Sequence, residues 1–303
     1  LTFENGNASA SGANTLSVLT TTGYGIRVLP SAAATLNTNI ICTASIAVDE
    51  GGTLSVTGGS LGSGPLLIDG NLNLNTNLTN AELSGATTGI ITRTTAGTST
   101  LTIAGATNST YLGSLNDGTG TIALAKTGTS TLTLSGVSSF SGGTSLSNGL
   151  IVADATGALG TGAVVFSGTS QRLSIGNDVT LSNNITLGAN NGAQGAALLE
   201  PGLSVTGAAT LNGPINITTN PFGGGHFGNR SSGSFHVKGP ITSSVAVIHR
   251  IGSVTYWGGG TGYTLMRVTG TALLGANNGL ATNAVLGLGV SGSGTFDLAG
   301  YNQ

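Results

Sequence analysis

The residues best able to do chemistry gather in one stretch of the chain, residues 220–267. This stretch contains all three histidines, the only tryptophan (Trp257), the only methionine, and four of the eight lysines and arginines. No aspartate or glutamate occurs between Glu200 and Asp297. A basic segment with aromatic side chains is typical of a surface that contacts a glycan, an anionic partner or a neighbouring subunit.

We therefore predict a contact surface in this segment. Tryptophan and tyrosine offer flat apolar faces with polar edges, and arginine and lysine add positive charge. The alternative is an ordinary loop that covers an edge of the fold. The candidate contact residues are Arg230, His236, Lys238, Arg250, Tyr256, Trp257, Tyr263 and Arg267.

The histidines do not predict a metal site. His226, His236 and His249 lack the close spacing of preorganised ligands, and no carboxylate or thiolate lies near them in sequence. Calcium-binding solenoid turns carry regularly repeated aspartates, which the glycine-rich turns of this chain lack. We expect neither a metal ion nor a cofactor.

Two glycine patterns match enzyme motifs without the structural context that those motifs require. Residues 287–292 fit the dinucleotide fingerprint, and residues 58–62 spell a nucleophile elbow around Ser60, but no helical pattern follows either one. Glycoside hydrolases need two facing carboxylates, whereas the adjacent acids Asp49 and Glu50 would point to opposite faces of a strand. We expect no enzymatic activity. The alternative is a β-helix protein that binds or degrades polysaccharide.

The composition excludes several classes of protein. Glycine occupies 53 of 303 positions, which disfavours helices because each glycine costs a helix interior about 1 kcal/mol. A hydrophobic fraction of 38% with a net charge of −2 disfavours disorder and gives no electrostatic footprint for nucleic acid. No apolar run approaches the roughly 18 residues that a membrane helix needs.

Strict alternation of apolar and small polar residues predicts short β-strands. Each burst places its apolar residues on one face of a strand and its Thr, Ser or Asn residues on the other. Glycine-containing pairs that favour turns separate the bursts. The clearest bursts are residues 54–56, 72–74, 101–103, 132–134, 179–181, 185–187, 203–205, 215–217 and 296–298.

Internal repetition favours a parallel β-helix over a two-layer sandwich. Residues 93–105 reappear as residues 126–136, and residues 185–192 are echoed by residues 273–279. Both echoes join a strand to its turn, which is how a solenoid repeats. Coils of roughly 20–25 residues would give about a dozen coils, each burying its apolar face against the next.

Several segments resemble the autotransporter-associated β-strand repeat. They are Leu124–Gly136, Phe140–Thr144, Asn148–Val152 and Gly157–Gly162, together with the terminal Gly294–Gln303. The resemblance implies a secreted or surface-displayed bacterial protein that forms a right-handed β-helix. The family has no common catalytic residues, so the resemblance implies none here.

The expected organisation has three parts. Residues 1–219 form β-solenoid coils, residues 220–267 form an atypical basic and aromatic insertion or loop-rich coils, and residues 268–303 form further coils that continue to an uncapped end. We expect a non-enzymatic rigid segment of a bacterial surface stalk, adhesin or self-assembling filament, located outside the cell. Its expected partners are other copies of itself, end to end or side by side, or further chain of the same protein, with a surface glycan as a further option.

Overall fold

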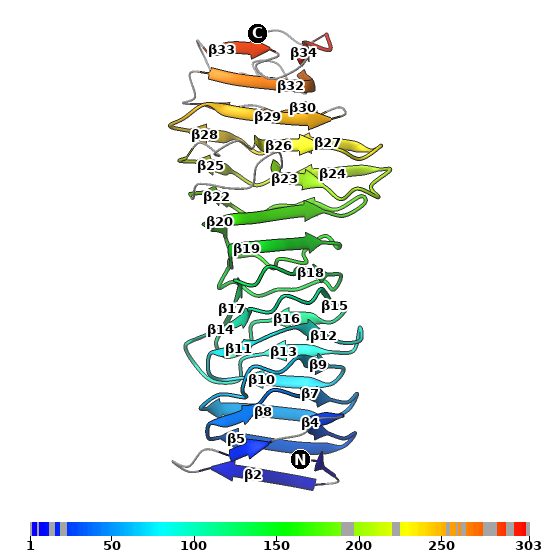
Figure 1. The fold of residues 1–303 in the computed structure, drawn as a ribbon, viewed down its shortest axis with the longest axis vertical. Coiled ribbons are helices and arrows are strands. Elements are labelled where there is room, and N and C mark those ends of the chain that lie inside the picture. The colour runs from blue at the N-terminus through cyan, green and yellow to red at the C-terminus, as the bar shows by residue number, and fades with distance from the viewer. Residues whose placement is uncertain are drawn as a thin grey trace. The chain divides into compact units, whose positions relative to one another are not determined.

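A computed structural model gives the fold of the chain. It describes residues 2–4, 6–11, 16–18, 23–188, 197–219, 225–252, 255–258, 260–261, 265–274, 284–288 and 294–300. Within these ranges the regular elements are all β-strands, and parallel strands stack into a β-solenoid of about 10 turns (Figure 1). The prediction of an all-β parallel solenoid is confirmed. The same ranges contain no helix that is long and apolar enough to cross a membrane.

The chain forms two compact units. The first unit comprises Leu1–Thr144 with Gly157–Gly162, and the second comprises Ser145–Thr156 with Ala163–Gln303. The strands up to the end of the first unit are β1 (Thr2–Phe3), β2 (Gly6–Ser11), β3 (Leu16–Val18), β4 (Tyr24–Val28), β5 (Ala32–Asn37), β6 (Ile40–Cys42), β7 (Ser45–Val48), β8 (Thr53–Gly58), β9 (Leu66–Ile68), β10 (Asn71–Leu74), β11 (Leu78–Asn80), β12 (Leu83–Ser84), β13 (Ile90–Thr92), β14 (Thr98–Ile103), β15 (Ser109–Tyr111), β16 (Ser114–Asn116), β17 (Thr121–Lys126) and β18 (Thr131–Leu134). The strands that follow are β19 (Thr144–Ala153), β20 (Val164–Ile175), β21 (Thr180–Leu181), β22 (Ile185–Leu187), β23 (Ala197–Pro201), β24 (Ala208–Leu211), β25 (Ile215–Ile217), β26 (Gly225–Asn229), β27 (Ser234–Val237), β28 (Ile241–Ser243), β29 (Val247–Gly252), β30 (Thr255–Trp257), β31 (Gly260–Thr261), β32 (Leu265–Leu274), β33 (Val285–Leu288) and β34 (Gly294–Asp297).

Parallel ladders build the first unit. Strands β1, β4, β7, β9 and β12 form one sheet, and strands β2, β5, β8, β10, β13 and β16 form another. The step from one coil to the next varies along the second of these sheets. Thr53 lies opposite Asn71, whereas Ile90 lies opposite Ser114, which is a longer step along the chain. The predicted coil length of roughly 20–25 residues therefore describes the average coil better than each individual coil.

The alternating sequence pattern becomes columns of buried side chains. Along strands β8, β10, β13 and β16 the inward residues stack directly over one another, and each is fully buried: Leu54, Leu72, Ile91 and Leu115. Burying an aliphatic side chain of this size stabilises the fold by about 1.5–3 kcal/mol. The core is thus a set of aliphatic columns that run across the coils.

Tyr111 is one of the fully buried side chains of the first unit that are not aliphatic. Its side chain is fully buried, and glycines surround its ring. A Cβ atom on Gly113 would lie 2.6 Å from the Tyr111 hydroxyl oxygen, and one on Gly89 would lie 3.1 Å from it. Glycine is needed at position 113 because only a residue without a side chain leaves room for this ring.

Three ladders run through the described strands of the second unit. The first runs from β20 through β22, β25 and β28 to β31, the second from β20 through β23, β26, β29 and β32 to β33, and the third from β21 through β24, β27, β30 and β32 to β34. In the first ladder Ile185 lies opposite Ile215, a longer step than any in the sheet that contains β8. Ile241, by contrast, lies opposite Gly260, which is a short step, so coil length varies along the second unit as well.

The described parts of residues 220–267 form strands of these ladders. Strand β26 pairs with β23 before it and β29 after it, and β27 pairs with β24 and β30. The described strands of this segment therefore continue the parallel pairing of the strands before and after them. One predicted strand is wrong: residues 203–205 form a turn, in which the Val205 N–H donates to the Gly202 carbonyl oxygen at 3.0 Å.

Candidate functional site

Trp257 lies in the core of the second unit. Its side chain is 2% exposed, and in the ladder it lies between Val237 and Leu274, which are both fully buried. Its ring packs edge-on against Phe227, with 4.9 Å between the ring centres. The expectation that Trp257 presents an aromatic face to a partner is wrong, because strand alternation turns this residue inward.

His236 and Lys238 lie on the outside of the third ladder. His236 alternates with the buried Phe235 and Val237 along β27, and one of its ring nitrogens lies 2.9 Å from the Ser234 hydroxyl. Partial burial and, to a smaller extent, the positive charge of Lys238 lower the pKa of His236. His236 is therefore neutral at pH 7, and the exposed Lys238 supplies the positive charge here.

The remaining candidate residues are divided between ladders. Arg267 is exposed on β32, in the second ladder, opposite Ile248 of β29. Arg250 and Tyr256 lie in β29 and β30, but their side chains, like all of Tyr263, fall outside the described part of the structure. The described side chains among the eight candidates do not form a single aromatic patch.

His226 is buried and neutral. One of its ring nitrogens lies 3.0 Å from the Thr219 carbonyl oxygen, and burial lowers the pKa of His226 to about 4. Within the described ranges, no three His, Cys, Asp or Glu side chains come together as ligands for a metal ion. His226 thus contributes to packing at this point of the second unit.

A charged cluster that the sequence analysis missed lies on the second ladder. Glu200 on β23 is 2% exposed and forms ion pairs with Arg172 on β20 and with Arg230, which follows β26. The Arg230 Nη2 donates to both carboxylate oxygens of Glu200, at 3.0 and 3.2 Å. We call these three residues the Arg–Glu–Arg triad. They come from three consecutive coils.

Strand alternation places the triad on the outer face of its ladder. Leu173, Leu199 and Phe227 lie opposite one another and are fully buried. Their sequence neighbours Arg172 and Glu200 must therefore face outward. The spacing between successive members of the triad is close to the spacing between these ladder partners. Because these ladder partners are known only from the structure, the sequence by itself carried no signal that could have revealed the triad.

The charges of the triad do not balance. One carboxylate faces two guanidinium groups, which leaves a surplus of one positive charge. Burial, followed by repulsion from Arg230, lowers the pKa of Arg172. The buried Nε atom of Arg172 has no hydrogen-bond partner among the described residues. A buried carboxylate is costly unless it is paired, so Glu200 depends on these arginines.

The chemistry available to the triad is binding rather than catalysis. Two guanidinium groups stabilise the ionised form of a carboxylate, which makes it a weak base. Of the adjacent acids Asp49 and Glu50, which were considered as a catalytic pair, Asp49 is likewise held in an ion pair, with Arg27 at 2.8 Å. Ser60 is exposed between β8 and β9, and its carbonyl oxygen accepts the Ile40 N–H at 2.8 Å.

The comparisons with known proteins do not assign the chain to a family. No family model matches the chain, and neither does any curated protein or solved structure. The fold is that of a β-solenoid repeat protein.

Proposed function

We propose that this chain is a non-enzymatic, rigid β-solenoid segment of a bacterial protein that acts outside the cell, at the surface or in a secreted stalk, adhesin or filament. The solenoid fold and the resemblance of residues 124–162 to autotransporter-associated repeats support this proposal. In this role the chain acts as a stiff scaffold. Surfaces on its coils make contacts with other copies of the chain, with further chain of the same protein or with a glycan.

The observation that carries the proposal is a set of hydrogen bonds in which polar side chains between strands accept backbone N–H groups of the following coil. We call these polar residues fasteners. The Asn77 Oδ1 accepts the Thr100 N–H at 2.8 Å, and the Asn108 Oδ1 accepts the Thr131 N–H at 2.8 Å, and in both cases the donor lies on the following coil. Asn77 directly precedes β11 and Asn108 directly precedes β15, so each carboxamide satisfies a backbone N–H group just beyond the point where the ladder between the two coils begins. Side chains that could bind or react instead hold the coils together.

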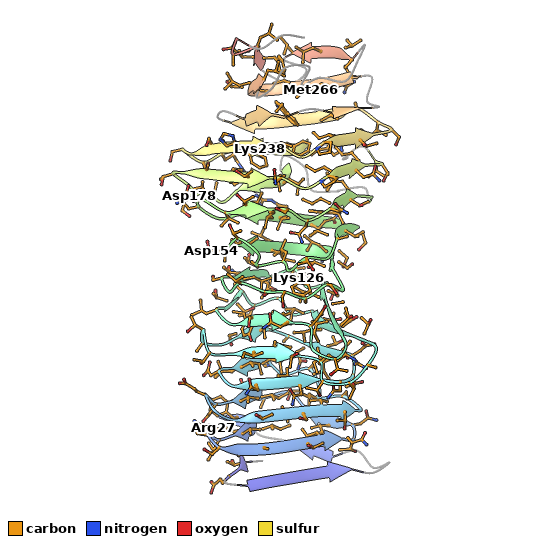
Figure 2. All side chains as sticks on the ribbon, turned by 180° about the vertical axis from the view of Figure 1, so that it is seen from behind. Arg27, Lys126, Asp154, Asp178, Lys238 and Met266 are labelled. Atoms are coloured by element: carbon orange, nitrogen blue, oxygen red, sulfur yellow. The ribbon has the colours of Figure 1, made fainter. Side chains whose placement is uncertain are left out.

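The same arrangement recurs in the second unit. The Asn177 Oδ1 accepts the N–H groups of Thr206 at 3.0 Å and Gly207 at 2.8 Å, and the Asp178 Oδ1 accepts the Ala208 N–H at 2.9 Å. Figure 2 shows Asp178 at the margin of this unit, on the outside of its coils. Fasteners at the turns of both units favour a mechanical role over a catalytic one.

Two assays on the purified chain test this proposal. Electron microscopy over a range of concentrations should show separate elongated particles or their ordered association, and a heterogeneous flexible chain would contradict a rigid scaffold. Incubation with neutral and uronate-containing polysaccharides should release neither reducing ends nor unsaturated products. Continuous release of either product over many turnovers would establish an enzyme and overturn the proposal.

A further inference from the structure

The surplus positive charge of the triad is not balanced by another acidic residue nearby in sequence. After Glu200 the next acidic residue is Asp297. Asp178, the acid that precedes Glu200, is engaged at its own turn with Asn177 and Ala208. Each of the two guanidinium groups carries five N–H donors, whereas a carboxylate has about four acceptor sites. The two arginines therefore have more donors than Glu200 can accept.

The two arginines remain accessible to a ligand. The side chains of Arg172 and Arg230 are 29% and 34% exposed, whereas that of Glu200 is 3% exposed. Glu200 thus lies beneath the guanidinium groups and holds them close together on the outer face of the ladder.

We propose that Arg172 and Arg230 together bind one oxyanion, a carboxylate or sulfate group, on the solvent side of Glu200. The planar guanidinium fork matches these groups through two parallel hydrogen bonds. The bound oxyanion neutralises the surplus charge and uses the remaining donors. The shared chemistry suits a free inorganic anion or the same group carried on an acidic polysaccharide. This site stands independently of the scaffold role proposed above.

The decisive variant is Glu200→Gln, because it removes the internal anion and keeps the shape of the side chain. If the arginines bind an external oxyanion, this variant should bind sulfate at least about 10-fold more tightly than the parent chain, since the internal competitor is gone. Isothermal titration with sodium sulfate at constant ionic strength measures this change. Equal or weaker sulfate binding by Glu200→Gln would overturn the proposal.

The matched pair of controls is Arg230→Gln and Arg267→Gln. Both remove one positive charge from the second ladder, but only Arg230 contacts Glu200. Arg230→Gln should lose at least about 10-fold in sulfate affinity, and Arg267→Gln should change it less than about 2-fold. Equal losses of affinity in the two variants would mean that sulfate binding depends only on the net charge of the chain, or that the signal reflects the general exclusion of sulfate from protein surfaces. Either result would contradict a specific site.

The parent chain provides a test that does not depend on the folding of any variant. It should bind sulfate saturably with one site per chain, and the absence of saturable binding would overturn the proposal. A second titration with a sulfated oligosaccharide and with its desulfated form distinguishes the sources of the anion. Tighter binding of the sulfated oligosaccharide than of inorganic sulfate identifies an acidic polysaccharide, and equal affinity identifies the free anion.

Discussion

The two compact units handle buried charge in opposite ways. In the first unit Lys126 is fully buried at the end of β17, where its Nζ donates to the carbonyl oxygen of Gly128. Figure 2 shows Lys126 within the stack of coils, whereas Arg27 lies at the margin. In the second unit the buried Glu200 is neutralised by two arginines from neighbouring coils. The Lys126 charge is met only within its own coil, by a backbone carbonyl group, so its burial costs free energy. The Glu200 charge is met by ion pairs with residues of two other coils, so it links those coils together.

From this contrast we expect stability to respond to charge removal with opposite signs in the two units. Removing the Lys126 charge relieves a desolvation cost, because burial disfavours the charged form of this side chain. Removing the Glu200 charge leaves two guanidinium groups close together without their counter-ion.

The largest effect is expected for Glu200→Ala. Breaking a buried ion pair by removing one partner costs about 3–5 kcal/mol in the free energy of unfolding. Asp49→Ala is the control, because it removes a carboxylate from the more exposed Arg27–Asp49 pair of the first unit and should change stability little. Urea unfolding measures both variants. Similar losses in the two variants would show that Glu200 is no more important than a surface pair.

A loss of stability in mild acid is expected from His226. The pKa of this side chain is about 4 in the folded chain, against the ordinary value of 6.5. Between these values the unfolded chain binds the proton and the folded chain does not, so the free energy of unfolding falls as pH decreases from 6.5 towards 4. The contribution of His226 over this range is on the order of 3 kcal/mol. His226→Gln should lose this component of the pH dependence, and an unchanged pH profile would contradict it.

The opposite response is expected from Lys126→Met. Burial lowers the pKa of Lys126 to about 8 from 10.5, so the charged form is disfavoured in the folded chain. Methionine should raise the free energy of unfolding at pH 7 by roughly 1–3 kcal/mol. In the parent chain stability should also rise between pH 8 and 10.5, and the variant should lack this rise. A destabilised variant would show that the bond to Gly128 outweighs the desolvation cost.

The smallest effect is expected at an uncharged fastener. The Asn116 Oδ1 accepts the N–H and hydroxyl groups of Ser139 at 3.2 and 3.0 Å. Asn116→Ala should lower the free energy of unfolding by about 1–2 kcal/mol. The control is Asn39→Ala, since Asn39 is exposed and its side chain makes no hydrogen bond within the described structure. Thermal unfolding of both variants should separate them, and equal melting temperatures would contradict the role of Asn116.

The sequence predicted the strands better than the site because local alternation is sufficient for a strand. The burst at residues 101–103 lies in β14, and the burst at residues 215–217 is β25. Residues 203–205 alternate equally well but form a turn, because the Val205 N–H donates to the Gly202 carbonyl oxygen instead of to a neighbouring strand. Alternation predicts which residues share a face, but it does not say whether a partner strand is present.

The site could not be predicted in the same way because it depends on register between coils. Trp257 was expected outside on the basis of its residue type, whereas its position in β30 turns it towards Phe227. Arg172, Glu200 and Arg230 are far apart in sequence and meet because the coil steps in this ladder nearly match their spacing. Coil lengths vary along the chain, so composition alone does not reveal which residues become neighbours.

Disulfide cross-linking between coils tests the central claim most directly. Thr102 on β14 and Ala125 on β17 are directly opposite each other on the outer face, so Thr102→Cys with Ala125→Cys should form a disulfide under mild oxidation. Thr98→Cys with Ala125→Cys is the control, because its residues are offset by four positions, or about 13 Å along the strands. A bond in the first pair alone is the predicted result. Equal cross-linking in both pairs, or none in either, would contradict the parallel register on which the account depends.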